Sequence, residues 1–150
     1  MSLLREPRRG APEYSLHCLV ADWLRLALDP TQVFWTTLEH GGWRHAATAG
    51  RMKRVNVRAG IPDIMLVMPG GLVFFIELKA RDGVISAAQK LVHEELRRTG
   101  ASVFVCWSLE DVQCALDNMR VPLRLRLEKF SARRGRQQTL DFNNDVEGGR

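Results

Sequence analysis

Residues 60–79 form two short apolar segments joined by Pro69-Gly70-Gly71, with three charged residues set among them. Segments of this length that are rich in Val, Ile and Phe are typical of buried strands, and Pro-Gly-Gly is a turn signal. A hairpin through this turn is expected to bring Asp63 beside Glu77, and the alternation of side chains puts Glu77 and Lys79 on one face. Adjacent carboxylates are costly to bury unless a cation neutralises them. The simplest way to neutralise Asp63 and Glu77 is a divalent metal ion together with Lys79.

The chain of 150 residues has the length of one domain, and its composition is that of an ordinary globular protein. It has no apolar segment near the roughly 20 residues that cross a bilayer, and no secretory signal, so we expect a cytoplasmic or otherwise intracellular protein without membrane contact. The widely spaced Cys18, Cys106 and Cys114 predict reduced, buried thiols. The formal charge of +5 is compatible with nucleic acid as a partner, although many basic proteins bind none.

Hydrophobic periodicity and capping signals predict an α/β arrangement around the hairpin. In chain order the expected elements are a helix from Pro12 to about Asp29, strands over 33–38, 63–68 and 72–80, a helix from Ser86 to Gly100, a strand over 102–107, a helix from Ser108 to about Met119, and a short edge strand over 123–127. A strand, helix, strand order predicts a parallel pair. We expect one domain over 1–128 with a mobile basic leader at 1–10, and a flexible tail at 129–150.

A basic segment precedes the hairpin. Between positions 44 and 60 it carries five cations and no acid, and a short helix over 46–54 is compatible with it. The cations are Arg44, Arg51, Lys53, Arg54 and Arg58. A solvated loop and an arm that contacts phosphates both fit this pattern, and the position just before Asp63 favours the DNA-contacting arm.

The ordered motifs resemble those of the PD-(D/E)XK nuclease superfamily, and most closely its VRR-NUC branch, over about 13–116. The matching motifs are Gly60-Ile61-Pro62-Asp63, Ile76-Glu77-Leu78-Lys79 after thirteen intervening residues, Ser86 with Gln89, Gly100 before a Val-rich strand, and Ser108-Leu109-Glu110-Asp111. The resemblance implies an α/β fold with a restriction-endonuclease-like αβββαβ core, in which helices flank a mixed sheet.

The same resemblance implies an endonuclease that depends on Mg²⁺ or Mn²⁺ and leaves a 5′-phosphate and a 3′-hydroxyl. Asp63, Glu77 and the backbone carbonyl of Leu78 would hold the metal ion, and oxygen ligands suit these hard cations. Lys79 would orient the attacking water and offset charge in the transition state. A structural ion cluster at the strand end is the alternative for these side chains.

Three helical residues have two open roles each. Glu13 matches an acid that such nucleases carry on the first helix, but it also suits the positive end of a helix dipole. His17 lies one turn later on the same face, where it either joins Glu13 at the site or is a packed or solvated histidine. Gln89 matches a catalytic glutamine of the family, and it also completes the capping-box pattern that Ser86 begins.

Stand-alone VRR-NUC domains resemble structure-selective nucleases of DNA repair that act on branched DNA such as Holliday junctions. A homodimer suits two symmetric cuts. A catalytically silent DNA-binding module, and a nuclease of flaps, linear DNA or RNA, are the alternatives. In the tail, Gln137, Leu140 and Phe142 resemble peptides that dock on replication sliding clamps, but a chance match in a polar tail is the favoured explanation.

Overall fold

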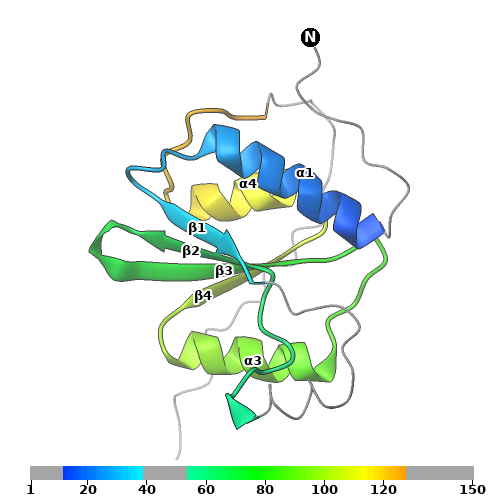
Figure 1. The fold of residues 1–150 in the computed structure, drawn as a ribbon. Coiled ribbons are helices and arrows are strands. Elements are labelled where there is room, and N and C mark those ends of the chain that lie inside the picture. Colours follow the sequence, from blue (N-terminus) through cyan, green and yellow to red (C-terminus); the bar gives the residue numbers. More distant parts are fainter. Residues whose placement is uncertain (1–11, 39–53, 128–150) are drawn as a thin grey trace, which may run out of the picture.

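The computed structural model describes residues 12–38 and 54–127, which form a mixed four-stranded sheet flanked by helices (Figure 1). The elements are α1 (Pro12–Ala27), β1 (Phe34–Thr37), β2 (Ile64–Met68), the single turn η1 (Pro69–Gly71), β3 (Leu72–Leu78), α3 (Ala87–Arg98), β4 (Ser102–Cys106) and α4 (Leu109–Asn118). Both predicted helix starts at Ser86 and Ser108 are confirmed, since each serine accepts a hydrogen bond from the backbone three residues later.

The strands lie in the order β1-β2-β3-β4. The first two neighbouring pairs are antiparallel, while β3 and β4 are parallel, as the intervening helix α3 predicts. Helices α1 and α4 cover one face of the sheet and α3 covers the other (Figure 1). The α/β class and the mixed sheet expected from the sequence are therefore confirmed.

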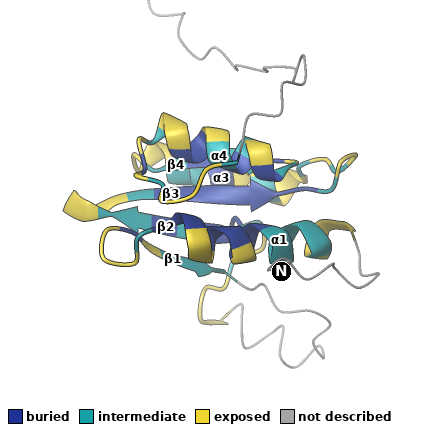
Figure 2. Cartoon of the chain, turned by 90° about the horizontal axis from the view of Figure 1, so that it is seen from above, coloured by how far each residue is buried: buried dark blue, intermediate teal, exposed yellow. Residues whose placement is uncertain are grey.

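Strand β3 lies in the sheet between the helical layers (Figure 1), and most of it is coloured as buried in Figure 2. Its alternate side chains Phe74, Ile76 and Leu78 belong to the main hydrophobic core with α1 and α4. The intervening side chains, including Glu77, lie on the opposite face, which α3 covers. One central strand thus carries both the core and a buried carboxylate.

The predicted edge strand over 123–127 is wrong. Leu123 makes one isolated bridge with Leu28, and the segment forms no strand. The physical reason is that Leu28, the residue to which Leu123 bridges, directly follows α1. It is therefore not part of an extended strand along which further β-sheet hydrogen bonds could form. The expected helix over 46–54, the leader and the tail lie almost wholly outside the described residues. Within the described ranges, no helix combines the length and the apolar character needed to span a bilayer.

Candidate metal centre

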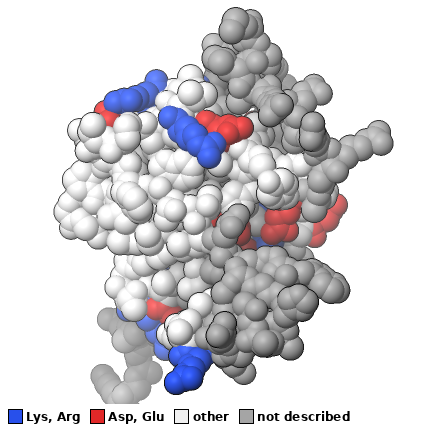
Figure 3. Space-filling model, in the orientation of Figure 1, with Lys and Arg blue, Asp and Glu red and all other residues white. Residues whose placement is uncertain are grey.

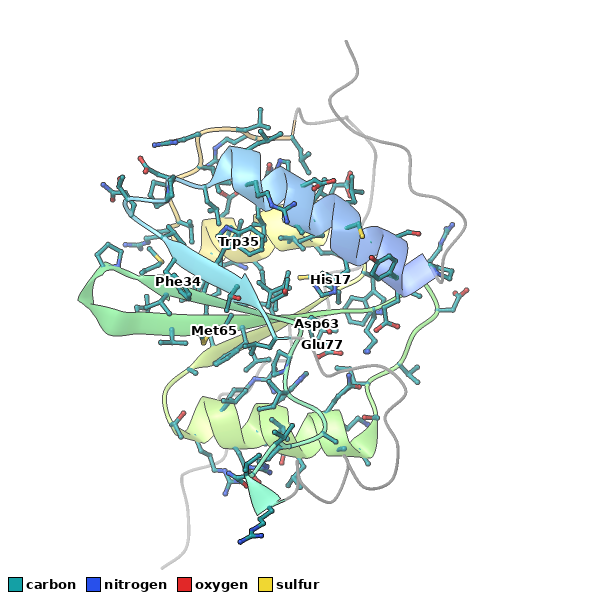
Figure 4. All side chains as sticks on the ribbon, viewed as in Figure 1. His17, Phe34, Trp35, Asp63, Met65 and Glu77 are labelled. Carbon is teal, nitrogen blue, oxygen red and sulfur yellow. The ribbon has the colours of Figure 1, made fainter. Side chains whose placement is uncertain are left out.

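The hairpin register places the two predicted carboxylates side by side. Ile64 pairs with Ile76, so the next step of the antiparallel register brings Asp63 opposite Glu77. Asp63 is held there because its Oδ2 accepts a hydrogen bond of 2.7 Å from the backbone N–H of Leu78. Figure 4 shows Asp63 and Glu77 next to each other at the end of the hairpin.

Helix α1 adds a third carboxylate. Glu13 lies in its first turn, and one oxygen from each of Glu13, Asp63 and Glu77 falls within 4.8 Å of the others. In Figure 3, acidic side chains gather at the side of the molecule where α1 begins in Figure 1. Segments that are 50 residues or more apart in the chain, at α1 and at the hairpin, therefore converge on one acidic cluster.

Lys79 provides a positive charge inside this cluster. Its Nζ lies 2.7 Å from Glu77 Oε1 and 3.2 Å from Glu13 Oε1, and its side chain is only 9% exposed. Burial lowers the pKa of Lys79, but the hydrogen bonds and charges of Glu77 and Glu13 outweigh this effect and raise the pKa above its usual 10.5. The ammonium group is therefore charged at neutral pH.

For Asp63, burial outweighs the interactions that favour the charged form, whereas for Lys79 the partners outweigh burial. Burial raises the pKa of this carboxyl above its usual 3.8, and the charge of Glu77 adds to the increase. The N–H of Leu78 and electrostatic interactions with His17 and Lys79 oppose the rise in the pKa of Asp63 without cancelling it. The interactions that stabilise the charged form of Asp63 are therefore too weak to offset its burial.

Gln89 completes the predicted capping box and also contacts the buried carboxylate of Glu77. Its Oε1 accepts a hydrogen bond of 2.9 Å from the N–H of Ser86, which completes the capping box at the start of α3. Its Nε2 donates to Glu77 Oε1. The helix cap therefore fixes the side chain that contacts the buried carboxylate.

Gly60 sets the distance between the loop before Asp63 and helix α3. Its φ of +91° is in the left-handed region, and a Cβ at this position would lie 2.6 Å from the carbonyl carbon of Ala88. Only glycine combines this conformation with such a close backbone approach. The glycine of the Gly60-Ile61-Pro62-Asp63 motif thus reflects the close approach of this loop to the helix that carries Gln89.

Of the other residues predicted to be functional, those that the structure describes have no hydrogen bond or ion pair to the acidic cluster, and the rest lie outside the described residues. Arg54 is exposed, and Arg58 forms a two-pronged ion pair with Glu95 of α3, which the sequence did not reveal. His17 is half-buried one turn after Glu13 and close enough to influence Asp63. The predicted roles of Arg44, Arg51 and Lys53, and of Gln137, Leu140 and Phe142, concern residues outside the described ranges.

The donor set fits a hard divalent cation. Glu77 is 1% exposed, and its Oε2 has no hydrogen-bond partner in the described part of the chain. Three carboxylates face one ammonium group, so a further positive charge would be stabilising. Carboxylate oxygens are the ligands that Mg²⁺ and Mn²⁺ prefer.

Fold and site together define a mixed α/β domain with an acidic, lysine-containing centre at the end of its central hairpin. The family model of the VRR-NUC domain matches residues 6–109, and the chain belongs to this family. The resemblance drawn from the motifs is therefore confirmed, and the family is of nuclease type.

Two solved structures are similar to the chain. One, described as a VRR_NUC domain protein, is 20% identical, with a TM-score of 0.51 over 74% of this chain and 89% of that chain. The other, described as a VRR_NUC domain, is 21% identical, with a TM-score of 0.49 over 72% and 97% of the two chains. The first of these likenesses is one of fold. A comparison with curated proteins found no match.

Proposed function

We propose that this protein is a structure-selective DNA endonuclease that uses Mg²⁺ or Mn²⁺ and acts on branched DNA of the Holliday-junction type. The observation that carries the proposal is the convergence of Glu13, Asp63 and Glu77 within 4.8 Å, with the Lys79 ammonium among them. A purely structural ion cluster has no need of three converging carboxylates around a single ammonium group.

The residues have distinct roles in the proposed reaction. Asp63 and Glu77, with the carbonyl of Leu78 and with Glu13, would hold the cation. When bound, this cation supplies Lewis-acid polarisation of the phosphate and lowers the pKa of a bound water. Lys79 donates hydrogen bonds to the attacking water and offsets the negative charge that develops on the phosphate.

Two further groups position the reactants. Gln89 holds Oε1 of Glu77 and so fixes the carboxylate that Lys79 also contacts. The cations Arg44, Arg51, Lys53 and Arg54 supply contacts to DNA phosphates, which orient the substrate without reading its sequence. Arg58 contributes indirectly, because its pair with Glu95 holds the end of this basic segment on α3.

Branched DNA as the substrate rests on the resemblance to structure-selective nucleases. A four-way junction needs two symmetric cuts, and a two-fold homodimer would supply two equivalent sites. The dimer is therefore part of the proposal and is tested with it.

The test is cleavage of a labelled four-way DNA junction beside a flap, a linear duplex and a matched RNA junction. Reactions contain Mg²⁺, Mn²⁺ or EDTA, and they compare the wild type with Lys79→Ala and with Lys90→Ala, an exposed lysine of α3 outside the cluster. Paired symmetric cuts that need metal, disappear in Lys79→Ala and persist in Lys90→Ala are expected.

Other outcomes separate the alternatives. Preferred cutting of flaps, linear DNA or RNA would retain the metal centre and overturn the junction assignment. Binding of DNA without cutting of any substrate would favour the silent binding module.

A further inference from the structure

The second oxygen of Glu77 faces a buried histidine. Glu77 Oε1 is contacted by Lys79 and Gln89, whereas Oε2 lies 3.6 Å from Nε2 of His93. Both Glu77 and His93 are 1% exposed. Within the described ranges, neither Oε2 nor Nε2 has a hydrogen-bond partner.

The gap between these two atoms is small. It is roughly 0.6 Å longer than the usual N–H···O distance of about 3.0 Å, so it is not a hydrogen bond as it stands. A small rotation of either side chain closes it. Buried polar atoms are nearly always paired, and these two unpaired atoms lie within 3.6 Å of each other.

Helix α3 presents both donors to the same carboxylate. Gln89 and His93 are four residues apart, which places them one above the other on one helix face. Gln89 contacts Oε1, and His93 faces Oε2. One face of α3 thus carries a side chain near each of the two carboxylate oxygens of Glu77.

His93 is not part of the acidic cluster itself. The group of atoms within 4.8 Å of one another comprises oxygens of Glu13, Asp63 and Glu77, and among the described residues no histidine belongs to it. His93 therefore acts on the centre through Glu77. A neutral imidazole is sufficient, because it carries one N–H donor.

We propose that His93 is a positioning residue whose Nε2–H holds Oε2 of Glu77, so that the carboxylate keeps the orientation in which the centre binds a divalent cation. This inference rests on the metal-dependent function proposed above. It makes α3 a support for the centre, with Gln89 and His93 fixing one oxygen each.

The test measures Mn²⁺ affinity by titration calorimetry, and thermal unfolding in EDTA. It compares the wild type with His93→Leu, which fills similar space without a donor, and His93→Gln, which restores an N–H at similar reach. Val92→Ala is the matched control, because Val92 is a buried neighbour on α3 whose truncation weakens packing alone.

We expect His93→Leu to bind Mn²⁺ about 10- to 100-fold more weakly, the usual effect of losing a group that supports a metal ligand. Its Tm in EDTA should also fall, because Oε2 of Glu77 loses the donor assigned to it. His93→Gln should recover most of the affinity. Val92→Ala should lower the Tm and keep wild-type affinity.

Three results would overturn the inference. These are wild-type Mn²⁺ affinity in His93→Leu, an equal loss of affinity in His93→Gln and His93→Leu, or weakened affinity in Val92→Ala that matches its loss of Tm. Failure of the proposed function looks different. If the wild type binds Mn²⁺ in this His93-dependent way but cuts no nucleic acid, the proposed nuclease function is refuted and the positioning role of His93 is retained. If the wild type binds no Mn²⁺, both fall.

Discussion

Lys79 and Glu77 form an ion pair of 2.7 Å although both side chains are at least nine-tenths buried. The same ammonium also reaches Glu13, at 3.2 Å, and so links the central hairpin to the first turn of α1. In the protein without metal, one lysine therefore offsets part of the charge of three converging carboxylates. A divalent cation entering the cluster would take over that stabilising role and leave Lys79 available for the substrate.

This relationship predicts the behaviour of Lys79→Met, which keeps most of the aliphatic stem and removes the charge. Breaking one side of a buried ion pair costs roughly 3–5 kcal/mol, so the variant should unfold at a clearly lower Tm in EDTA. Mn²⁺ should raise its Tm by more than it raises that of the wild type, because the cation replaces the missing charge. Differential scanning calorimetry with and without Mn²⁺ measures both effects.

Lys90→Met is the control for that experiment, because Lys90 is exposed on α3. Its free energy of unfolding should stay within about 0.5 kcal/mol of the wild-type value, as is usual for surface substitutions. Equal Tm values for Lys79→Met and the wild type in EDTA would show that the buried pair contributes nothing to folding.

The two roles of Gln89 can be separated by two substitutions. Gln89→Glu keeps an oxygen to accept from Ser86 but replaces the donor to Glu77 with negative charge, so cleavage should fall about 100-fold or more. Ser86→Ala removes the hydroxyl cap at a cost of about 1 kcal/mol and leaves the backbone N–H that holds Gln89, so cleavage should stay near wild type. Paired measurements of Tm and initial cleavage rate test this, and a parallel loss in both variants would contradict it.

The parts of this structure that follow from local rules were predictable. The hairpin turn, the alternation of β3 and the capping signals at Ser86 and Ser108 each depend on a few neighbouring residues, and they fix where Asp63, Glu77 and Gln89 lie. The start of the first helix at Glu13 is also local information, but its approach to the hairpin is not, and only the family resemblance suggested it. The pair of Asp63 and Glu77 was therefore predictable from local rules, and the full cluster was not.

Contacts that depend on the path of a longer segment were not predictable. Arg58 pairs with Glu95 across 37 positions, and the sequence shows only that both are charged. His93 shares a helix face with Gln89, which was a usable signal, but its burial against Glu77 depends on how closely α3 approaches β3. The alternation over 123–127 indicates a strand only where a partner strand exists. In the described part of the chain, Leu123 bridges to Leu28, which directly follows a helix and belongs to no strand.

Asp63 should make stability depend on pH. Its pKa in the folded protein is above the usual 3.8, so the folded state binds more protons than the unfolded state between these two values, and stability falls as pH rises through that range. Asp63→Asn should therefore raise the Tm at pH 7 in EDTA, and this gain should shrink as the pH falls toward 4. Tm values between pH 4 and 8 measure the difference.

Asp82→Asn, in the exposed turn after β3, is the comparison for that series. It should leave the pH profile parallel to that of the wild type. A destabilised Asp63→Asn at pH 7 would mean that the hydrogen bond from Leu78 outweighs the burial of the charge.

The three thiols should react in the order of their exposure. Cys106 is 1% exposed, and burial raises its pKa to about 12, so almost no thiolate forms at pH 8. Cys114 is exposed and Cys18 is half-buried, which corrects the expectation that all three thiols are buried. With a thiol reagent and peptide mapping, Cys114 should be modified first and Cys106 only on unfolding. Early modification of Cys106 would contradict the burial.

Gly60 provides the sharpest test of how the centre is built, because its conformation and its close contact can be separated. Gly70 has a similar φ of +83°, but a Cβ added to it would meet no atom of the described residues within 4 Å. A Cβ on Gly60 would instead meet the backbone of Ala88 and Gln89. Gly70→Ala should therefore show the conformational cost alone, about 1–2 kcal/mol, and Gly60→Ala should be destabilised by more.

The same pair of variants separates stability from the geometry of the centre. In Gly60→Ala the loop is forced away from α3, which should move Asp63 relative to Gln89. Mn²⁺ affinity, measured by titration calorimetry, should consequently fall in Gly60→Ala and remain at the wild-type level in Gly70→Ala. Equal stability and equal affinity in the two variants would mean that the loop adjusts to the extra methyl group, and that the close approach at Gly60 does not position the centre.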